Sequence, residues 1–169
     1  MQLQDKKTVW VFTAACMLLA SSWGCAHHKV ASDLKTYINQ GILKVAHLET
    51  QALADYAAVV GANYTTNQAV YEALRYQVIP LYDQFLFALN EIKPRSQEVV
   101  QLHAVYRRGA ETMLRGFEAK LLGLETESVA LILEGNAAIE KGRNQTERWR
   151  TRLFALLQKY DVTRKKKRI

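Results

Sequence analysis

Residues that make tight turns and cross-links are scarce in this chain. Its 169 residues include 8 glycines, 2 prolines and 2 cysteines. All-β folds need many tight turns, which glycine and proline usually provide, so their scarcity argues against such folds. It also excludes collagen-like and linker-like chains. Two cysteines are too few for a disulfide scaffold or a Cys-based zinc site.

The remaining composition is that of an ordinary folded domain. Apolar residues make up 49% of the chain and charged residues 23%, so the chain can bury a core. The length is sufficient for one domain but hardly for two. The 23 Lys and Arg residues outnumber the 16 Asp and Glu residues, which gives a net charge of +7 and indicates an anionic partner.

The N-terminal segment has the pattern of an export signal. Lys6 and Lys7 are followed by the apolar stretch 9–20 (VWVFTAACMLLA), and no further charge occurs before Lys29. A basic start, a short apolar run and small residues before a cleavage point are typical of signal peptides. Two alternatives stay open. The uncharged residues 8–26 can serve as an uncleaved membrane anchor, or the protein is secreted without an anchor.

The residues after the apolar run resemble the lipobox of bacterial lipoproteins. In residues 19–25 (LASSWGC), Gly24 is the small residue that precedes the lipidated cysteine, whereas Ser22 and Trp23 depart from the usual pattern. The resemblance implies that residues 1–24 are removed and that Cys25 carries a diacylglycerol and an N-acyl chain, such as palmitate. More than one acyl chain gives a stable anchor. The lipobox resemblance also implies that the protein belongs to the bacterial cell envelope, on the outer membrane and facing the periplasm.

After a tether over residues 25–32, four helices are predicted. Apolar residues recur at steps of three and four, and no segment shows the alternation of a strand. The first helix covers 33–60, starts at Ser32 or Asp33 and ends at Gly61. The apolar patterns of the others are 70–92, 99–124 and 129–160, with starting caps at Thr66 or Asn67, at Ser96, and at Thr126 or Ser128.

Two places in these helices depart from an ordinary helical sequence. Pro80 lies inside the second helix, where it removes a backbone donor and predicts a kink. Residues 135–144 of the fourth segment are polar and include two glycines, which lowers helix propensity. This segment is either one continuous helix or two, and we favour continuity.

Four amphipathic segments with short connections predict an all-α fold, an antiparallel up-down-up-down four-helix bundle over residues 33–161. An even number of helices returns the C-terminus to the end that carries the N-terminus. The basic tail 162–169, with Arg164, Lys165, Lys166, Lys167 and Arg168, therefore lies near the membrane. Such a run interacts with anionic lipid or another anionic partner, or is merely solvated.

Motifs for catalysis or cofactor binding are missing from the sequence. There is no Glu-x-x-His pair for a di-iron site and no Cys-x-x-Cys-His for haem. His47 and His103 are read as surface or core residues, and His27 with His28 makes an incomplete metal shell. We therefore expect no cofactor, no metal and no enzyme activity.

Aromatic residues crowd the first three helices. Tyr71, Tyr76 and Tyr82 lie around Pro80, where a cleft for a small apolar ligand is one hypothesis. The alternative is that the aromatic side chains fill the core of the bundle with their hydroxyl groups at its edge.

The middle of the chain resembles small uncharacterised bacterial lipoproteins with a helical-bundle body. The resemblance rests on Ile79-Pro80-x-Tyr82-x-x-Phe85, on Ile92-x-Pro94, and on the apolar and aromatic spacing of residues 100–110. It implies no particular activity.

Our hypothesis is a non-catalytic, lipid-anchored envelope protein that serves as a structural or protein-interaction module with an envelope protein partner. The alternative is a module that holds a small apolar ligand or signal in the bundle. Residues 30–159 contain 15 basic and 14 acidic side chains, so the body is nearly neutral and the excess charge lies in the tail. We therefore expect an anionic membrane surface as a partner and no nucleic acid.

Overall fold

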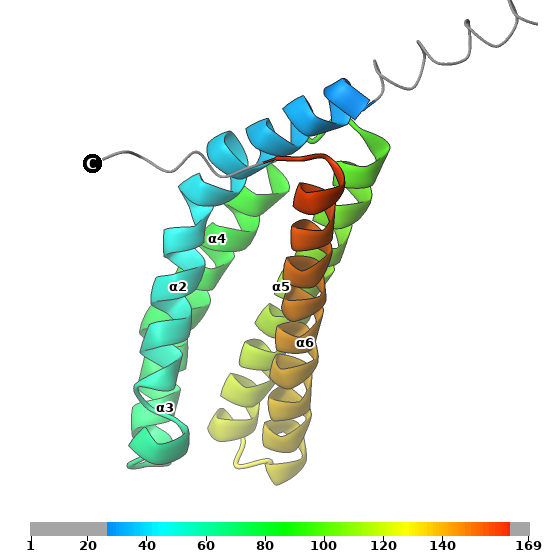
Figure 1. The fold of residues 1–169 in the computed structure, drawn as a ribbon. Coiled ribbons are helices and arrows are strands. Elements are labelled where there is room, and N and C mark those ends of the chain that lie inside the picture. The colour runs from blue at the N-terminus through cyan, green and yellow to red at the C-terminus, as the bar shows by residue number, and fades with distance from the viewer. Residues whose placement is uncertain (1–26, 163–169) are drawn as a thin grey trace, which may run out of the picture.

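The computed structural model describes residues 27–162, which form four helical rods joined by short turns (Figure 1). The first rod contains residues 27–36, the π-helix η1 (Tyr37–Ile42) and α2 (Leu43–Ala57). After the 3-10 turn η2 (Gly61–Asn63), the second rod contains α3 (Asn67–Ala73), the π-helix η3 (Leu74–Val78) and α4 (Ile79–Asn90). The third and fourth rods are α5 (Gln97–Glu125) and α6 (Val129–Lys159). No strand occurs in this part of the chain, so the all-α prediction is confirmed for it.

Two of the predicted helix starts have the side-chain caps that their residue types suggested. The Thr66 hydroxyl accepts a hydrogen bond from the Ala69 amide at 3.1 Å, and the Ser128 hydroxyl accepts one from the Leu131 amide at 3.4 Å. Each cap satisfies a backbone donor that has no partner within the helix. The prediction that these Thr and Ser residues cap helix N-termini is therefore confirmed for the second and fourth rods.

The first helix differs from the prediction at its start. Residues 27–32, expected in a tether, are helical, and Val30 is buried. Ser32 and Asp33 therefore lie inside the helix and do not cap it. The Asp33 carboxylate instead accepts hydrogen bonds from the Arg95 amide at 3.0 Å and from the Ser96 amide and hydroxyl, both at 2.7 Å. It thus fixes the start of α5 from a neighbouring rod.

Helix α6 runs unbroken from Val129 to Lys159, as we favoured for its polar middle. Its two glycines pair with glycines of α5. A Cβ atom on Gly135 would lie 2.7 Å from the Gly116 carbonyl oxygen, and one on Gly142 would lie 2.7 Å from the Gly109 carbonyl oxygen. Real Cβ atoms do not approach a backbone oxygen so closely, so hydrogen at these positions lets the backbones touch. The order of the pairs, 116 with 135 and 109 with 142, shows that α5 and α6 are antiparallel.

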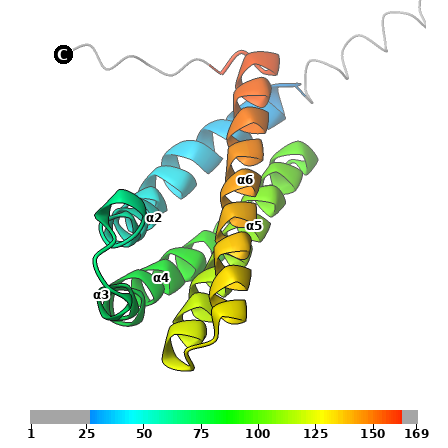
Figure 2. The ribbon, with the colours of Figure 1, turned by 90° about the horizontal axis from the view of Figure 1, so that it is seen from below.

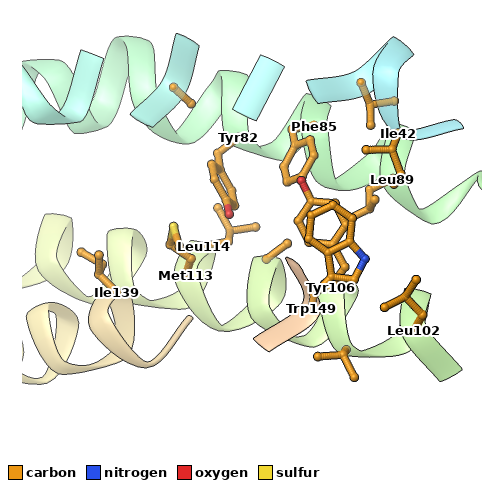
Figure 3. Packing of buried hydrophobic residues seen from close by; sticks show 14 of the residues in the cluster. Ile42, Tyr82, Phe85, Leu89, Leu102, Tyr106, Met113, Leu114, Ile139 and Trp149 are labelled. Carbon is orange, nitrogen blue, oxygen red and sulfur yellow. The ribbon is translucent and has the colours of Figure 1, made fainter. Parts of the chain in front are cut away.

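The other two rods pack against this pair through large side chains. Figures 1 and 2 show α2 beside α4 and α5 beside α6, as two layers. Aromatic rings fill the space between them (Figure 3): Tyr82 and Phe117 have ring centroids 5.3 Å apart, and Phe85 and Tyr106 have centroids 5.8 Å apart. Tyr82, Phe85, Tyr106 and Phe117 are at most 1% exposed. The aromatic residues therefore fill the core, but the expectation that their hydroxyl groups lie at its edge is wrong for Tyr82, whose hydroxyl is buried.

The glycine contact between α5 and α6 can be tested with Gly116→Ala. At an exposed helical position this change would stabilise the helix, because alanine has the higher helix propensity. Here the new Cβ would lie 2.6 Å from the Ile139 backbone nitrogen. We therefore expect the free energy of unfolding, measured by chemical denaturation, to fall by about 1–3 kcal/mol.

Gly41→Ala is the matched control for this substitution, because its Cβ would approach side-chain atoms of Ile92, the nearest at 3.0 Å, and no backbone atom. A Gly116→Ala protein as stable as wild type would contradict the close approach of the two backbones.

Candidate functional site

Two groups of predicted site residues lie outside the described part of the chain. These are Cys25, the predicted lipidation site, and the basic run from Arg164 to Arg168. The described residues begin at His27, two residues after Cys25, and end at Val162, two residues before Arg164. The positions of these described residues can be compared.

The first and last described residues lie together at one end of the domain (Figure 1). The His27 ring packs on the Tyr160 ring with centroids 4.9 Å apart, and His27 Nε2 lies 3.3 Å from the Lys159 carbonyl oxygen. The Tyr160 hydroxyl donates to Glu98 at 2.9 Å, which joins α6 to α5. The pKa of Glu98 is lowered, chiefly by its own backbone amide and then by this hydroxyl. The first described residue is thus held against the last turn of α6.

The three tyrosines proposed for a ligand cleft do not lie together. Tyr82 is fully buried between the layers, whereas Tyr76 is 67% exposed on the surface. The Tyr71 hydroxyl accepts from Arg75 at 2.9 Å and donates to Glu125 at 3.3 Å. Its side chain lines a surface hollow of about 640 Å³ between α3 and the turn that joins α5 to α6. No single cleft therefore contains all three among the described residues.

A chain of buried hydrogen bonds links three of the four rods. Trp149 Nε1 donates to the Tyr37 hydroxyl at 3.2 Å, and that hydroxyl lies 3.4 Å from His103 Nδ1. The direction of the bond between Tyr37 and His103 depends on which ring nitrogen of the histidine carries the proton. His103 Nε2 is buried and has no partner. Desolvation, then Arg107 and Lys93, lowers the pKa of His103 to about 4.

A second buried polar group is the carboxylate of Glu49. The Tyr106 hydroxyl donates to Glu49 Oε2 at 2.6 Å, and the Tyr106 ring stacks on Trp149 with centroids 4.0 Å apart. Glu49 Oε1 and the Tyr82 hydroxyl are both buried without a partner. Desolvation raises the pKa of Glu49, although the Tyr106 bond and Arg150 oppose the rise. Burial of a carboxylate that is only half satisfied costs stability.

This polar cluster, Tyr37, Glu49, Tyr82, His103, Tyr106 and Trp149, was not predicted from the sequence. Its partners are far apart in the chain, so no local spacing marks it. Helical periodicity would at most have placed these residues on buried faces. Of the two alternatives left open for His103, a surface or a core residue, the structure shows the core residue.

The described residues hold no group of three or more His, Cys, Asp or Glu side chains that could bind a metal ion. Within residues 27–162, no helix has both the length and the apolar content required to cross a bilayer. No family model matches this chain, and neither a curated protein nor a solved structure matches it.

His103 predicts a loss of stability on acidification. Its folded-state pKa lies below the ordinary value of 6.5, so the unfolded chain binds the proton more readily between about pH 6.5 and 4. The contribution of His103 to stability should therefore fall as the pH falls through this range. Thermal unfolding across this range should show a flatter dependence of stability on pH for His103→Asn, whose neutral amide offers both a donor and an acceptor to Tyr37. An equally steep profile would contradict the burial of His103.

Glu49 and Tyr106 predict a coupled effect. Tyr106→Phe removes the donor to a buried carboxylate, so we expect the free energy of unfolding at neutral pH to fall by about 1–3 kcal/mol. In a Glu49→Gln background the same change should cost less, because no charge is left unpaired. Denaturation of the four proteins of this double-mutant cycle measures the difference. Additive effects would show that the two groups do not interact.

Proposed function

We propose that this chain is a non-catalytic, lipid-anchored protein of the bacterial cell envelope, most simply on the outer membrane and facing the periplasm. In this proposal residues 1–24 are removed, Cys25 carries the lipid, and the helical domain acts by contacting an envelope protein partner. The lipobox-like stretch before Cys25 and the basic tail motivate the proposal. No nucleic acid is expected as a partner of an exported protein.

The contact between His27 and Tyr160 carries the proposal. His27 follows Cys25 by two residues, and Tyr160 precedes Arg164 by four. Because these two rings touch, a lipid on Cys25 and the run from Arg164 to Arg168 both start from one end of the domain. Each cation near an anionic membrane surface contributes about 1 kcal/mol to binding. The acyl chains and the tail would therefore act on the same membrane.

The arrangement of the rods within this proposal is an up-down-up-down bundle with the second rod kinked at Pro80. The connections between the rods are short, which favours antiparallel neighbours. The π-helix η3 ends two residues before Pro80. A wider turn at that point offers room for the proline ring, which would otherwise clash with the carbonyl group four residues earlier. With this arrangement the end far from the termini points away from the membrane.

A second candidate function is a module that holds a small, mainly apolar ligand. It is favoured by the two partnerless polar atoms among the aromatic rings, Glu49 Oε1 and the Tyr82 hydroxyl. Each would gain a hydrogen bond from a ligand with a suitable polar group. Native mass spectrometry of the protein purified from its own host would show the ligand as added mass, and the mass of the bare polypeptide would count against this function.

The anchor is tested by Cys25→Ser. The wild-type protein should fractionate with membranes, and its N-terminal peptide should start at Cys25 and carry the mass of the acyl groups. The serine variant cannot form the thioether, so we expect loss of that mass and accumulation of the uncleaved precursor. Cys16→Ser is the matched control and should change neither result. An unmodified wild-type N-terminus would overturn the proposed anchor.

A further inference from the structure

The near-neutral body of this protein has two oppositely charged halves. The contact between Gly109 and Gly142 marks the middle of α5 and α6, and Glu49 and Phe85 reach Tyr106 near this level from the other layer. The terminal half, residues 27–48, 85–108 and 143–162, holds 12 basic and 5 acidic side chains. The far half, residues 49–84 and 109–142, holds 4 basic and 10 acidic ones.

The separation does not depend on where the dividing level is drawn. Glu49 and Asp83 are the acidic residues nearest to it on the first two rods. Assigning both to the terminal half changes its net charge from +7 to +5 and that of the far half from −6 to −4. The described domain as a whole has a net charge of only +1, with 16 basic and 15 acidic side chains. Its small net charge thus conceals a large dipole along the rods.

Most of the basic charge in the terminal half is available to a partner. All 12 basic side chains there are exposed. Three of them, Arg107, Arg143 and Arg150, form ion pairs with glutamates on their own helices. The other nine have no ion-pair partner among residues 27–162. They are Lys29, Lys35, Lys44, Lys93, Arg95, Arg108, Arg148, Arg152 and Lys159.

Of the five acidic residues in the terminal half, Glu91 and Asp161 are exposed, Glu147 pairs with Arg150, and the other two accept hydrogen bonds. Asp33 accepts three hydrogen bonds at the start of α5, and Glu98 accepts one from Tyr160. These carboxylates are thus already bonded to groups of the protein. The first rod lies across this end of the domain (Figure 1) and carries Lys29 and Lys35, and further basic residues lie on the last part of α6. Arg148 and Arg152, one helical turn apart on α6, border the same surface hollow.

From this distribution we infer that the terminal half of the folded domain is itself a contact surface for an anionic phospholipid bilayer. The bilayer attracts this half and repels the acidic half, so the domain is oriented with its far end away from the membrane. The inference extends the proposed function, which supplies the membrane, from the tail to the helical body. It does not require that the attachment at the N-terminus be a lipid.

The test uses acylation of native lysines in the full chain, purified from membranes with its own N-terminus and reconstituted into vesicles. One set of vesicles is phosphatidylcholine, and the other contains about one third phosphatidylglycerol. The negative surface potential raises the local proton concentration about threefold, which slows acylation of nearby lysines by the same factor. We expect this slowing at Lys29, Lys35, Lys93 and Lys159, read by peptide mass spectrometry, and its loss at high salt.

The far half supplies the internal control. Lys141 should be acylated at the same rate on both vesicles. Arg148→Glu with Arg152→Glu should reduce the protection of Lys159, whereas Arg75→Glu with Arg115→Glu changes the charge equally in the far half and should leave the protection intact. Circular dichroism checks that both double variants keep their helix content.

Equal acylation of the terminal-half lysines on both vesicles would overturn the inference, as would equal slowing at Lys141. Protection that disappears when Arg164 to Arg168 are replaced by glutamine would also overturn it, because the tail alone would then act on the membrane. The mass of the N-terminal peptide is read from the same digest. An unmodified N-terminus together with protected lysines would contradict the lipid anchor and support the membrane-contact surface. A lipidated N-terminus without protected lysines would support the anchor and contradict the surface.

Discussion

The structure depends on the contact between the backbones of α5 and α6. Glycines at 109 and 116 of α5 face glycines at 142 and 135 of α6, and a Cβ atom on any of the last three would lie within 2.8 Å of a backbone atom across the contact. The two longest helices therefore form one closely packed unit. Because little side-chain volume lies between them, the rest of the core must be made with the other two rods, and large aromatic residues fill that space.

The aromatic layer in turn explains why polar atoms are buried. Tyrosine and tryptophan supply ring surface, but each brings a polar group that has to be accommodated. Trp149 donates a hydrogen bond to the Tyr37 hydroxyl, and the Tyr106 hydroxyl donates one to the carboxylate of Glu49. The Tyr82 hydroxyl is left without a protein partner. A wide gap filled by amphipathic rings is thus the physical origin of the polar cluster.

Features that depend on local interactions were predicted from the sequence, whereas features that depend on contacts between distant residues were not. Apolar periodicity predicted four helices, and Thr66 and Ser128 marked two helix starts, because both signals act within one or two turns. The glycines of α6 were interpreted as weak points, although they repeat every seven residues, as do those of α5. Asp33 suggested a local cap, yet it bonds Ser96 on another rod. Tyr106 and Glu49 are 57 residues apart, and no local pattern connects them.

His103 and Glu49 have opposite effects on the pH dependence of stability. The lowered pKa of His103 makes its contribution to stability fall as the solution is acidified below pH 6.5. The raised pKa of Glu49 acts in the opposite direction: its ionisation costs stability, and acidification removes that cost. Above the ordinary carboxyl pKa of 4.5 the two effects overlap and partly cancel. A flat profile for the wild-type protein would therefore be compatible with both groups being buried, and only the single variants separate them.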